Sequence, residues 1–327
     1  MITINDIAKI AGVAKSTVSR YLNGGSISST TASKIEAVIK EHNYVPSTFA
    51  QSLKAKNSRL IGFIIPRLDS RAAIATLEGI DKKVQEHDYQ LLIANTNQST
   101  EEEVRRIYAF AKEKVSGIIL MATEITEKHI QAVKEVGIPT IFVGQEHEEV
   151  YSVVHDDYQA GFEFTRQLLA LGHRKITYFS VAENDHAVGV LRKKGVLDAI
   201  KQEAPSSVDV VETTFSMVDA IDIGMSQLES NHDSLWIAAT DNIAVGLLKA
   251  AHTMKVAVPE QLSLAGFGGY DISDYVYPSL STVHFRYVEA GEQSFHYLDQ
   301  LIKGEDIPKK TVIDFDIYHR ESVADLT

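Results

Sequence analysis

The sequence has no cysteine, so disulfides, thiolate metal sites and cysteine nucleophiles are excluded. It also lacks long apolar runs: stretches such as Leu60 to Ile65 and Gly117 to Ala122 are far too short to span a bilayer. The N-terminus has no basic segment followed by an apolar one, as a secretory signal would have. These absences predict a cytoplasmic protein with no membrane partner.

Signatures of catalysis and cofactor binding are equally scarce. A late glycine cluster, Gly266-Phe267-Gly268-Gly269, is not the G-x-G-x-x-G that opens a dinucleotide-binding helix after a first strand. The sequence contains no G-x-S-x-G elbow, no H-E-x-x-H pair and no phosphate-binding lysine loop. Its twelve histidines are scattered along the chain. We therefore expect no enzyme activity, no cofactor and no metal site.

The charge that is present is unevenly distributed. The chain has a net charge of −12, yet residues 1–60 carry about +5 and the remainder carries about −17. A basic end on an acidic body is typical of a small module that touches a polyanion while the body stays away from it. Chance clustering in a short segment is the alternative. With 327 residues, 44% of them hydrophobic, the chain is long enough for two or three packed domains.

The basic segment has the pattern of three short helices. Apolar positions 4, 7, 8 and 11 form one helical face, and Gly12 ends that helix. A second helix is predicted from Lys15 to Leu22, with Val18 on its buried side, and a third from about Thr31 to His42. Two short helices joined by a tight glycine-containing turn are the sequence form of a helix-turn-helix.

This region resembles the DNA-binding headpiece of the lac-repressor (LacI/GalR) family at fixed spacing. The resemblance implies a helix-turn-helix headpiece over residues 1–45, a hinge helix and linker over 46–58, and double-stranded operator DNA as a partner. It also implies a homodimer, because two headpieces on a palindromic operator need matching two-fold symmetry. The matching segments are Asp6-Ile7-Ala8, Ala11-Gly12-Val13-Ala14, Thr17-Val18-Ser19-Arg20-Tyr21-Leu22-Asn23, Asn43-Tyr44-Val45-Pro46 and Ala50-Gln51-Ser52-Leu53.

The same match implies which residues contact DNA. Base reading is implied for Lys15, Ser16 and Arg20, whose polar groups suit base edges in a major groove. Leu53 is implied to wedge into a minor-groove step, whereas packing on the following domain is the alternative for this side chain. The other implied hinge contacts are Ser47, Ala50 and Gln51. Implied phosphate contacts are Thr3, Thr17, Ser19, Asn23, Ser28, Thr31 and Tyr44; Thr17 and Ser19 also suit ordinary helix surface.

From residue 59 onward, short apolar strands alternate with amphipathic helices. This alternation predicts an α/β fold with parallel sheets covered by helices on both faces. The strands fall into two sets of about five, so we expect two similar lobes, residues 59–157 with 286–318 and residues 158–285. The resemblance implies the same two-lobed, doubly wound, periplasmic-binding-protein-like core over 59–327. The predicted strands are 60–66, 90–94, 117–121, 140–143, 152–155, 176–181, 208–212, 235–239, 262–266 and 282–285.

Ligands of such sheets lie at the carboxyl ends of the strands, here in a cleft between the lobes. The segment Pro66-Arg67-Leu68-Asp69-Ser70 follows the first strand and resembles the trehalose-operon repressor branch; sucrose-operon repressors are similar along most of the chain. The planar donors of an arginine suit vicinal hydroxyls or a phosphate. Arg67 with Ser70 therefore predicts a phosphate clamp, although a solvated strand-end charge is the alternative for Arg67. The expected effector-binding residues are Arg67, Asp69, Ser70, Gln145, Arg192, Thr240, Asp241 and Tyr287.

Together these features predict a sugar-responsive transcriptional repressor, associated with the nucleoid, that a sugar or sugar phosphate releases from its operator. Trehalose 6-phosphate and sucrose 6-phosphate both remain candidates, because Gln145 stands where the trehalose repressor has a second arginine. A solute-binding transport protein would need an export signal and no helix-turn-helix. An enzyme of similar fold would need a catalytic cluster.

Overall fold

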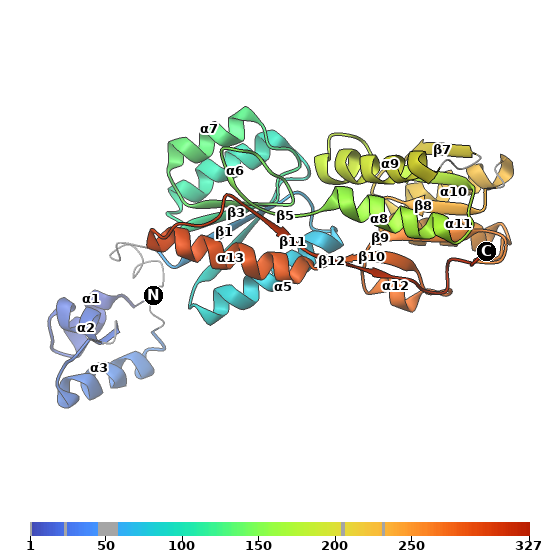
Figure 1. The fold of residues 1–327 in the computed structure, drawn as a ribbon. Coiled ribbons are helices and arrows are strands. Elements are labelled where there is room, and N and C mark those ends of the chain that lie inside the picture. The colour runs from blue at the N-terminus through green and yellow to red at the C-terminus, as the bar shows by residue number, and fades with distance from the viewer. Residues whose placement is uncertain (1, 23–24, 45–57, 204–206, 231–232) are drawn as a thin grey trace. The chain divides into compact units, whose positions relative to one another are not determined.

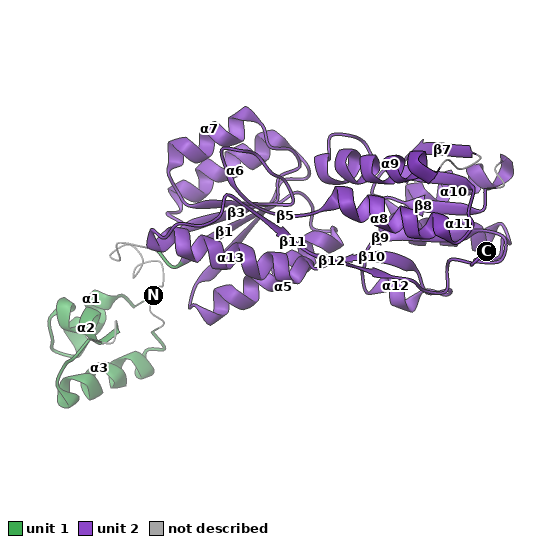
Figure 2. Ribbon diagram, viewed as in Figure 1, with its two compact units in different colours: residues 1–59 green, residues 60–327 purple. Residues whose placement is uncertain are grey.

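A computed structural model of the chain describes residues 2–22, 25–44, 58–203, 207–230 and 233–327. These residues form two compact units, 1–59 and 60–327, which are shown in different colours in Figure 2. Each unit has its own hydrophobic core, and each is described by itself below.

The first unit contains three helices, α1 (Ile4–Ile10), α2 (Lys15–Leu22) and α3 (Ser29–Glu41) (Figure 1). All three predicted helices are confirmed. Helix α3 begins two residues before the predicted start because the Ser28 hydroxyl caps it, accepting a hydrogen bond from the Thr31 backbone N–H at 3.3 Å. Apolar side chains from all three helices form the core: Ile7, Ala8, Ala11, Val18, Ile35 and Val38.

The turn between α1 and α2 depends on Gly12. Its φ of +67° lies in the left-handed region that favours glycine. The backbone N–H of Val13 then donates to the Ala8 carbonyl at 2.9 Å, which closes the turn. This geometry turns α2 so that Val18 enters the core and the opposite face of the helix meets solvent.

Six parallel strands form the first sheet of the second unit, in the order β11-β5-β4-β3-β1-β2. Ile61 and Phe63 of β1 pack with α5 and α13, whereas Ile64 packs with α6 and α7, so helices cover both faces. The elements are β1 (Leu60–Ile65), α5 (Arg71–Glu86), β2 (Gln90–Asn95), α6 (Thr100–Lys112), β3 (Gly117–Leu120), α7 (Glu127–Val136), β4 (Thr140–Val143), β5 (Tyr151–His155), α13 (Tyr287–Lys303) and β11 (Lys310–Ile313).

The second sheet has the order β12-β10-β9-β8-β6-β7 and is parallel except for β12. Large aromatic side chains such as Tyr178, Trp236 and Phe267 are fully buried in its core. The elements are α8 (Asp157–Ala170), β6 (Lys175–Ser180), the π-helix η1 (His186–Arg192), α9 (Lys193–Glu203), β7 (Ser207–Glu212), α10 (Met217–Ser230), β8 (Leu235–Ala238), α11 (Asp241–Thr253), β9 (Ser263–Gly268), α12 (Ile272–Tyr275), β10 (Ser281–Phe285) and β12 (Phe315–Tyr318).

The two-lobed α/β prediction is confirmed, and all ten predicted strands are present with ends shifted by at most two residues. Strands β11 and β12 were not predicted, because each has four residues and is partly exposed to solvent. Assigning all of residues 286–318 to the first lobe is wrong for β12, which pairs antiparallel with β10 in the second sheet. The chain thus passes between the sheets after β5, after β10 and again between β11 and β12.

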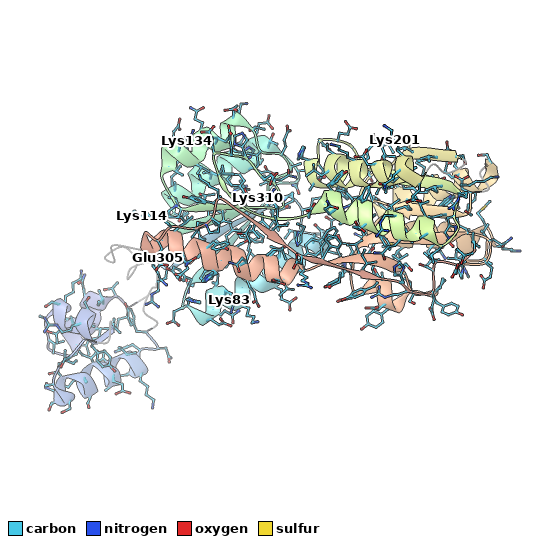
Figure 3. The ribbon with its side chains drawn as sticks, viewed as in Figure 1. Lys83, Lys114, Lys134, Lys201, Glu305 and Lys310 are labelled. Carbon is cyan, nitrogen blue, oxygen red and sulfur yellow. The ribbon has the colours of Figure 1, made fainter. Side chains whose placement is uncertain are left out.

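Charged side chains cover the outside of the second unit. The lysines labelled in Figure 3 include Lys134 on α7, which pairs with Glu149, and Lys83 on α5, which pairs with Glu86 at 2.8 Å. Exposed ion pairs of this kind are screened by water and add little stability. Within the described ranges, no helix is both long and apolar enough to cross a membrane.

Helices α5 and α13 pack unusually closely because each contributes a glycine to the contact. A Cβ on Gly79 would lie 2.0 Å from the Val288 carbonyl oxygen, and a Cβ on Gly291 would lie 2.1 Å from that of Thr76. Both helices cover the first sheet, and α13 follows β10 of the second sheet, so this contact holds the returning chain on the first lobe.

Gly79→Ala should therefore destabilise the protein, although alanine has a better helix propensity than glycine by about 1 kcal/mol. The added methyl group meets backbone atoms that cannot rotate away, and overpacking of this kind costs about 1–3 kcal/mol. Urea unfolding of both proteins measures the difference. Gln85→Ala, at an exposed position of the same helix, should change the free energy of unfolding by less than about 0.5 kcal/mol. Equal stability of Gly79→Ala and the parent would contradict the close-packing argument.

Candidate functional site

The outer face of α2 presents the three expected base-reading residues together. Lys15, Ser16 and Arg20 are all exposed, and Ser16 and Arg20 are four residues apart, which places them on one side of the helix. Val18 faces the core from the other side. A short helix with a cationic and hydroxyl-bearing face has the chemistry needed to enter a major groove.

Several of the expected phosphate contacts lie at helix starts. The Thr3 hydroxyl caps α1 by accepting a hydrogen bond from the Asp6 backbone N–H at 3.4 Å. The hydroxyl donates in turn to Asp6 Oδ2 at 2.7 Å, and the Thr3 backbone N–H donates to the same oxygen at 2.9 Å. Ser28 caps α3, and its hydroxyl lies 2.8 Å from that of Thr31. Exposed backbone N–H groups at such positions favour phosphate oxygens. Thr17 and Ser19 are half-buried on α2, and the half-buried Tyr44 packs against the core.

Asn23, Ser47, Ala50, Gln51 and Leu53 lie outside the described residues. Their implied contacts with DNA stay predictions from the sequence.

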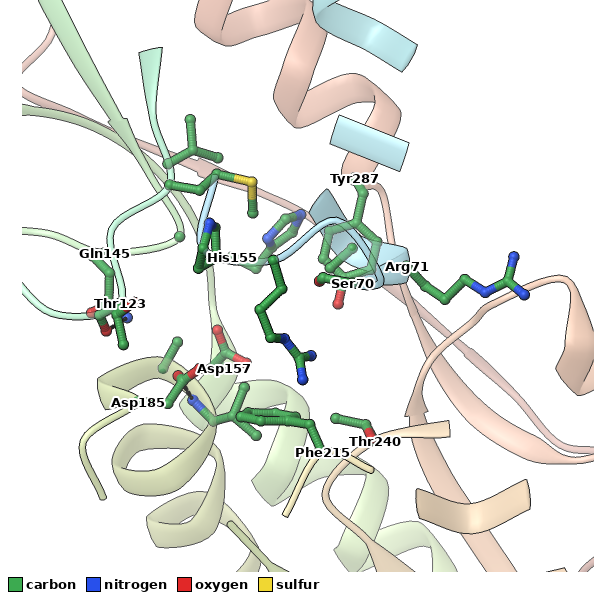
Figure 4. Close-up of a pocket in the computed structure, with 18 of the residues that line it drawn as sticks. Ser70, Arg71, Thr123, Gln145, His155, Asp157, Asp185, Phe215, Thr240 and Tyr287 are labelled. Carbon is green, nitrogen blue, oxygen red and sulfur yellow. Dashed lines mark hydrogen bonds between the residues drawn. The ribbon is translucent and has the colours of Figure 1, made fainter. Parts of the chain in front are cut away.

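In the second unit, a pocket lies where carboxyl ends of strands from both sheets meet (Figure 4). Six of the eight expected effector-binding residues line it: Arg67, Ser70, Gln145, Arg192, Thr240 and Tyr287. They come from the ends of β1, β4, β8 and β10 and from η1. The strand-end argument therefore located this pocket correctly.

A buried ion pair forms one wall of the pocket. Arg192 donates to Asp157 Oδ1 from Nε at 3.0 Å and from Nη2 at 2.5 Å, and Nη1 donates to the Ala239 carbonyl at 2.6 Å. The guanidinium also lies over the rings of Phe285, at 4.7 Å, and Phe267, at 5.3 Å. These hydrogen bonds use three of the five N–H groups of the guanidinium, and within the described chain the other two are left for a ligand.

The charge of Arg192 is maintained despite its burial. Burial opposes the charged form, but the nearby Asp157 carboxylate and Tyr287 outweigh that effect and raise the pKa of Arg192 above its ordinary value. The wall therefore offers a permanently cationic donor to hydroxyl or phosphate oxygens.

His155, at the end of β5, adds a neutral ring to the same wall. Burial lowers its pKa to about 4, and the charge of Arg192 contributes to the shift. The ring makes edge contacts with Phe285 and Tyr287, with centroid distances of 5.2 and 5.1 Å. Its buried Nε2 has no hydrogen-bond partner among the described residues. Aromatic faces beside polar atoms suit a sugar ring, which has an apolar face and hydroxyls at its edge.

Arg67 also lines the pocket, with its guanidinium 4.9 Å from the centre of the Phe215 ring. Ser70 caps α5, and its hydroxyl accepts a hydrogen bond from the Ala73 backbone N–H at 3.3 Å. The expected residue Asp69 does not line the pocket: its side chain is 82% exposed and lies 3.6 Å from Arg67 Nε. The Asp69 carboxylate instead lies at the surface, beside the Arg67 guanidinium.

Asp241 does not line the pocket either, contrary to expectation. It is fully buried as the first residue of α11, and its carboxylate accepts hydrogen bonds from the Ser273 hydroxyl at 2.7 Å and the Thr282 hydroxyl at 2.6 Å. Burial raises the pKa of Asp241 above its ordinary value, and these hydrogen bonds offset part of that rise. Thr240, the capping residue before it, is the one that reaches the pocket. Asp241 therefore joins α11 to β10 and to the segment around α12.

Sequence reasoning missed other lining residues, among them Thr123, His155, Asp157, Asp185 and Phe215 (Figure 4). His155 and Asp157 follow the strand-end rule and could have been found with it. Asp185 and Phe215 lie in loops between elements, where no sequence signal marks them. No group of three or more His, Asp or Glu in the described ranges could hold a metal ion.

Comparisons with known proteins give the same two-part organisation. The family model for bacterial regulatory proteins of the lacI family matches residues 3–47, and that for periplasmic binding protein-like domains matches residues 165–323. The lac repressor dimer bound to operator and the anti-inducer ONPF has a similar fold, with a TM-score of 0.88 and 23% identity over 99% of both chains. The transcription regulator CcpA of Lactococcus lactis has a TM-score of 0.73 at 26% identity, over 81% of this chain and 98% of its own.

Curated relatives match along nearly the whole length. The sucrose operon repressor of Staphylococcus xylosus is 38% identical over 317 residues, which cover 96% of this chain and 98% of the relative. The transcriptional regulator IdnR of Escherichia coli is 30% identical over 328 residues, covering 97% of each chain. From its helix-turn-helix, its two-lobed core and this similarity, the chain belongs to the lacI family of bacterial regulatory proteins.

Proposed function

We propose that this protein is a dimeric transcriptional repressor of a carbohydrate-utilisation operon and that a phosphorylated disaccharide releases it from a palindromic operator. The observation that carries the proposal is the pairing of two sites in one chain. The exposed face of α2 holds Lys15, Ser16 and Arg20, and the pocket of the second unit holds Arg67 and Arg192 among aromatic rings.

The DNA-binding part of the proposal is supported by charge and by relatives. Residues 1–60 carry about +5 in a chain of net charge −12, so this segment is the part suited to a polyanion. The lac repressor dimer, similar in fold, is bound to operator in its structure. A dimer of this chain would present two copies of α2 to two half-sites of a palindrome.

The effector part is supported by the donors of the pocket. Arg192 has two unused N–H groups for ring hydroxyls, and Arg67 beside Ser70 has the planar donors that bind a phosphate bidentately. The relation to the Staphylococcus xylosus sucrose operon repressor favours sucrose 6-phosphate, with trehalose 6-phosphate as the second candidate. Release from DNA requires the effector to bind more tightly to the conformation that does not bind DNA.

Two other functions fit the two-lobed core less well. A solute-binding transport protein does not need a helix-turn-helix, whereas residues 3–47 of this chain match the lacI-family model. An enzyme would need reacting groups at the pocket, whereas the charged pair there is held by mutual hydrogen bonds and Ala239. The regulatory relatives also favour a repressor.

Arg20→Ala should lower affinity for an operator, recovered by selection from random DNA, by about 10- to 100-fold. The loss corresponds to ~1–3 kcal/mol for one base contact of an arginine. Fluorescence anisotropy with labelled duplex measures it. Lys201→Ala, which removes a positive charge from α9 of the second unit, should leave DNA affinity unchanged. If both variants bind the operator like the parent, the assignment of α2 as the reading helix is incorrect.

Arg67→Ala should weaken binding of the phosphorylated effector by about 10- to 100-fold, since a charge-assisted contact worth ~1.5–3 kcal/mol is lost. Calorimetry with sucrose 6-phosphate, trehalose 6-phosphate and the two free sugars measures this, and operator affinity should be preserved. Arg166→Ala is the matched control, because Arg166 pairs with Glu163 on the surface of α8 and does not line the pocket. Tighter binding of a free sugar, or a greater loss in the control variant, would refute the role of Arg67.

A further inference from the structure

A buried polar network lies directly behind the pocket wall. Glu103 of α6 is fully buried, and its Oε1 accepts hydrogen bonds from the Thr123 backbone N–H at 3.0 Å and the Thr123 hydroxyl at 2.8 Å. Its Oε2 lies 3.0 Å from Nε2 of His129, which is also fully buried on α7. A buried carboxylate is costly unless donors surround it, and these three groups supply them.

The partners of His129 determine which nitrogen carries the proton. The Thr126 backbone N–H can only donate, and it contacts Nδ1 of His129 at 3.2 Å. Nδ1 is therefore an acceptor, so Nε2 carries the hydrogen and donates to Glu103. Glu103 thus accepts three hydrogen bonds from two residues, which holds Thr123 in one orientation.

The orientation of Thr123 in turn determines that of Gln145. The Thr123 carbonyl can only accept, and it accepts from Gln145 Nε2 at 3.3 Å. This bond uses one N–H of Nε2, so the other polar atom of the side chain is the acceptor Oε1, and Nε2 keeps one further N–H. Gln145 lines the pocket, and Figure 4 shows it beside Thr123. The network therefore sets the polarity of this part of the wall.

We propose that Glu103 and His129 are positioning residues that hold Gln145 with its acceptor Oε1 available to the effector, so that this part of the wall favours a hydroxyl over a phosphate. The inference rests on the proposed function, because it assigns a role within the same effector pocket. A sugar hydroxyl can donate to Oε1, whereas phosphate oxygens at neutral pH only accept and are repelled by it. The planar donors of Arg67 are the groups of the pocket that suit the phosphate.

A double-mutant cycle on the full-length protein tests this assignment. Gln145→Met removes the acceptor at similar size, and Glu103→Gln leaves a group that cannot accept from all three donors. Each should weaken sucrose 6-phosphate and sucrose alike by about 3- to 10-fold, the value of one net hydrogen bond. The double variant should lose no more than Gln145→Met alone, because Glu103 acts through Gln145. Calorimetry at low temperature, with unfolding curves to verify folding, gives the four affinities for each sugar.

Two further variants complete the design. Glu102→Gln, on the same helix but paired with Arg105 at the surface, should leave both affinities unchanged. Thr123→Val removes only the hydroxyl that anchors the loop to Glu103, and it replaces Glu103→Gln in the cycle if that variant does not fold.

The outcomes separate the inference from the proposed function. Losses that combine non-additively support the positioning role. If the losses of sugar affinity are purely additive, or if Glu103→Gln loses no affinity, the positioning role of Glu103 is overturned. The proposed function stays in place in that case. If the parent binds operator but none of sucrose, trehalose and their 6-phosphates, the proposed effector class is wrong and this inference falls with it.

Discussion

The hydrogen-bonded pair of Arg192 and Asp157 is the interaction on which the pocket depends. Neither charge could be buried alone, and loss of one partner from such a pair costs about 3–5 kcal/mol. Asp157 lies just after the first passage between the sheets, and Arg192 ends the π-helix η1. Through the Ala239 carbonyl the pair is also connected to the end of β8. One arginine therefore orders three segments at the point where a ligand would lie.

Close backbone approach makes this arrangement possible. A Cβ on Gly161 of α8 would lie 2.5 Å from the Arg192 carbonyl oxygen, so glycine is needed there for η1 to pack against α8. The π-helix is a wider turn than an α-helix and is often found at functional sites. The π-helix brings the guanidinium of Arg192 against the rings of Phe285 and Phe267, and these rings shield the Arg192–Asp157 pair from water.

Much of the fold could be predicted because its inner strands are continuous apolar runs, as in β1 and β8. Strands β11 and β12 lack that signal, since partly exposed strands of four residues resemble loops. The strand-end rule located six of the residues that line the pocket but misplaced Asp241, because adjacent residues at a helix start point in different directions. Glu103 could not be recognised at all: it is one of three consecutive glutamates in the first turn of α6, and only tertiary packing distinguishes it.

The three passages between the sheets have a consequence for how such proteins can be recombined. Residues 157–285 form a continuous block that carries Arg192, Phe215 and Thr240, so exchanging it with the equivalent block of a relative would replace a large part of the pocket in one step. The block is not self-sufficient, however. Strand β12 pairs with β10, and the Leu326 backbone N–H donates to the Leu171 carbonyl at 2.8 Å. A functional chimera must therefore inherit residues 315–327 from the same parent as the block, or its sheet would lose a matched edge strand.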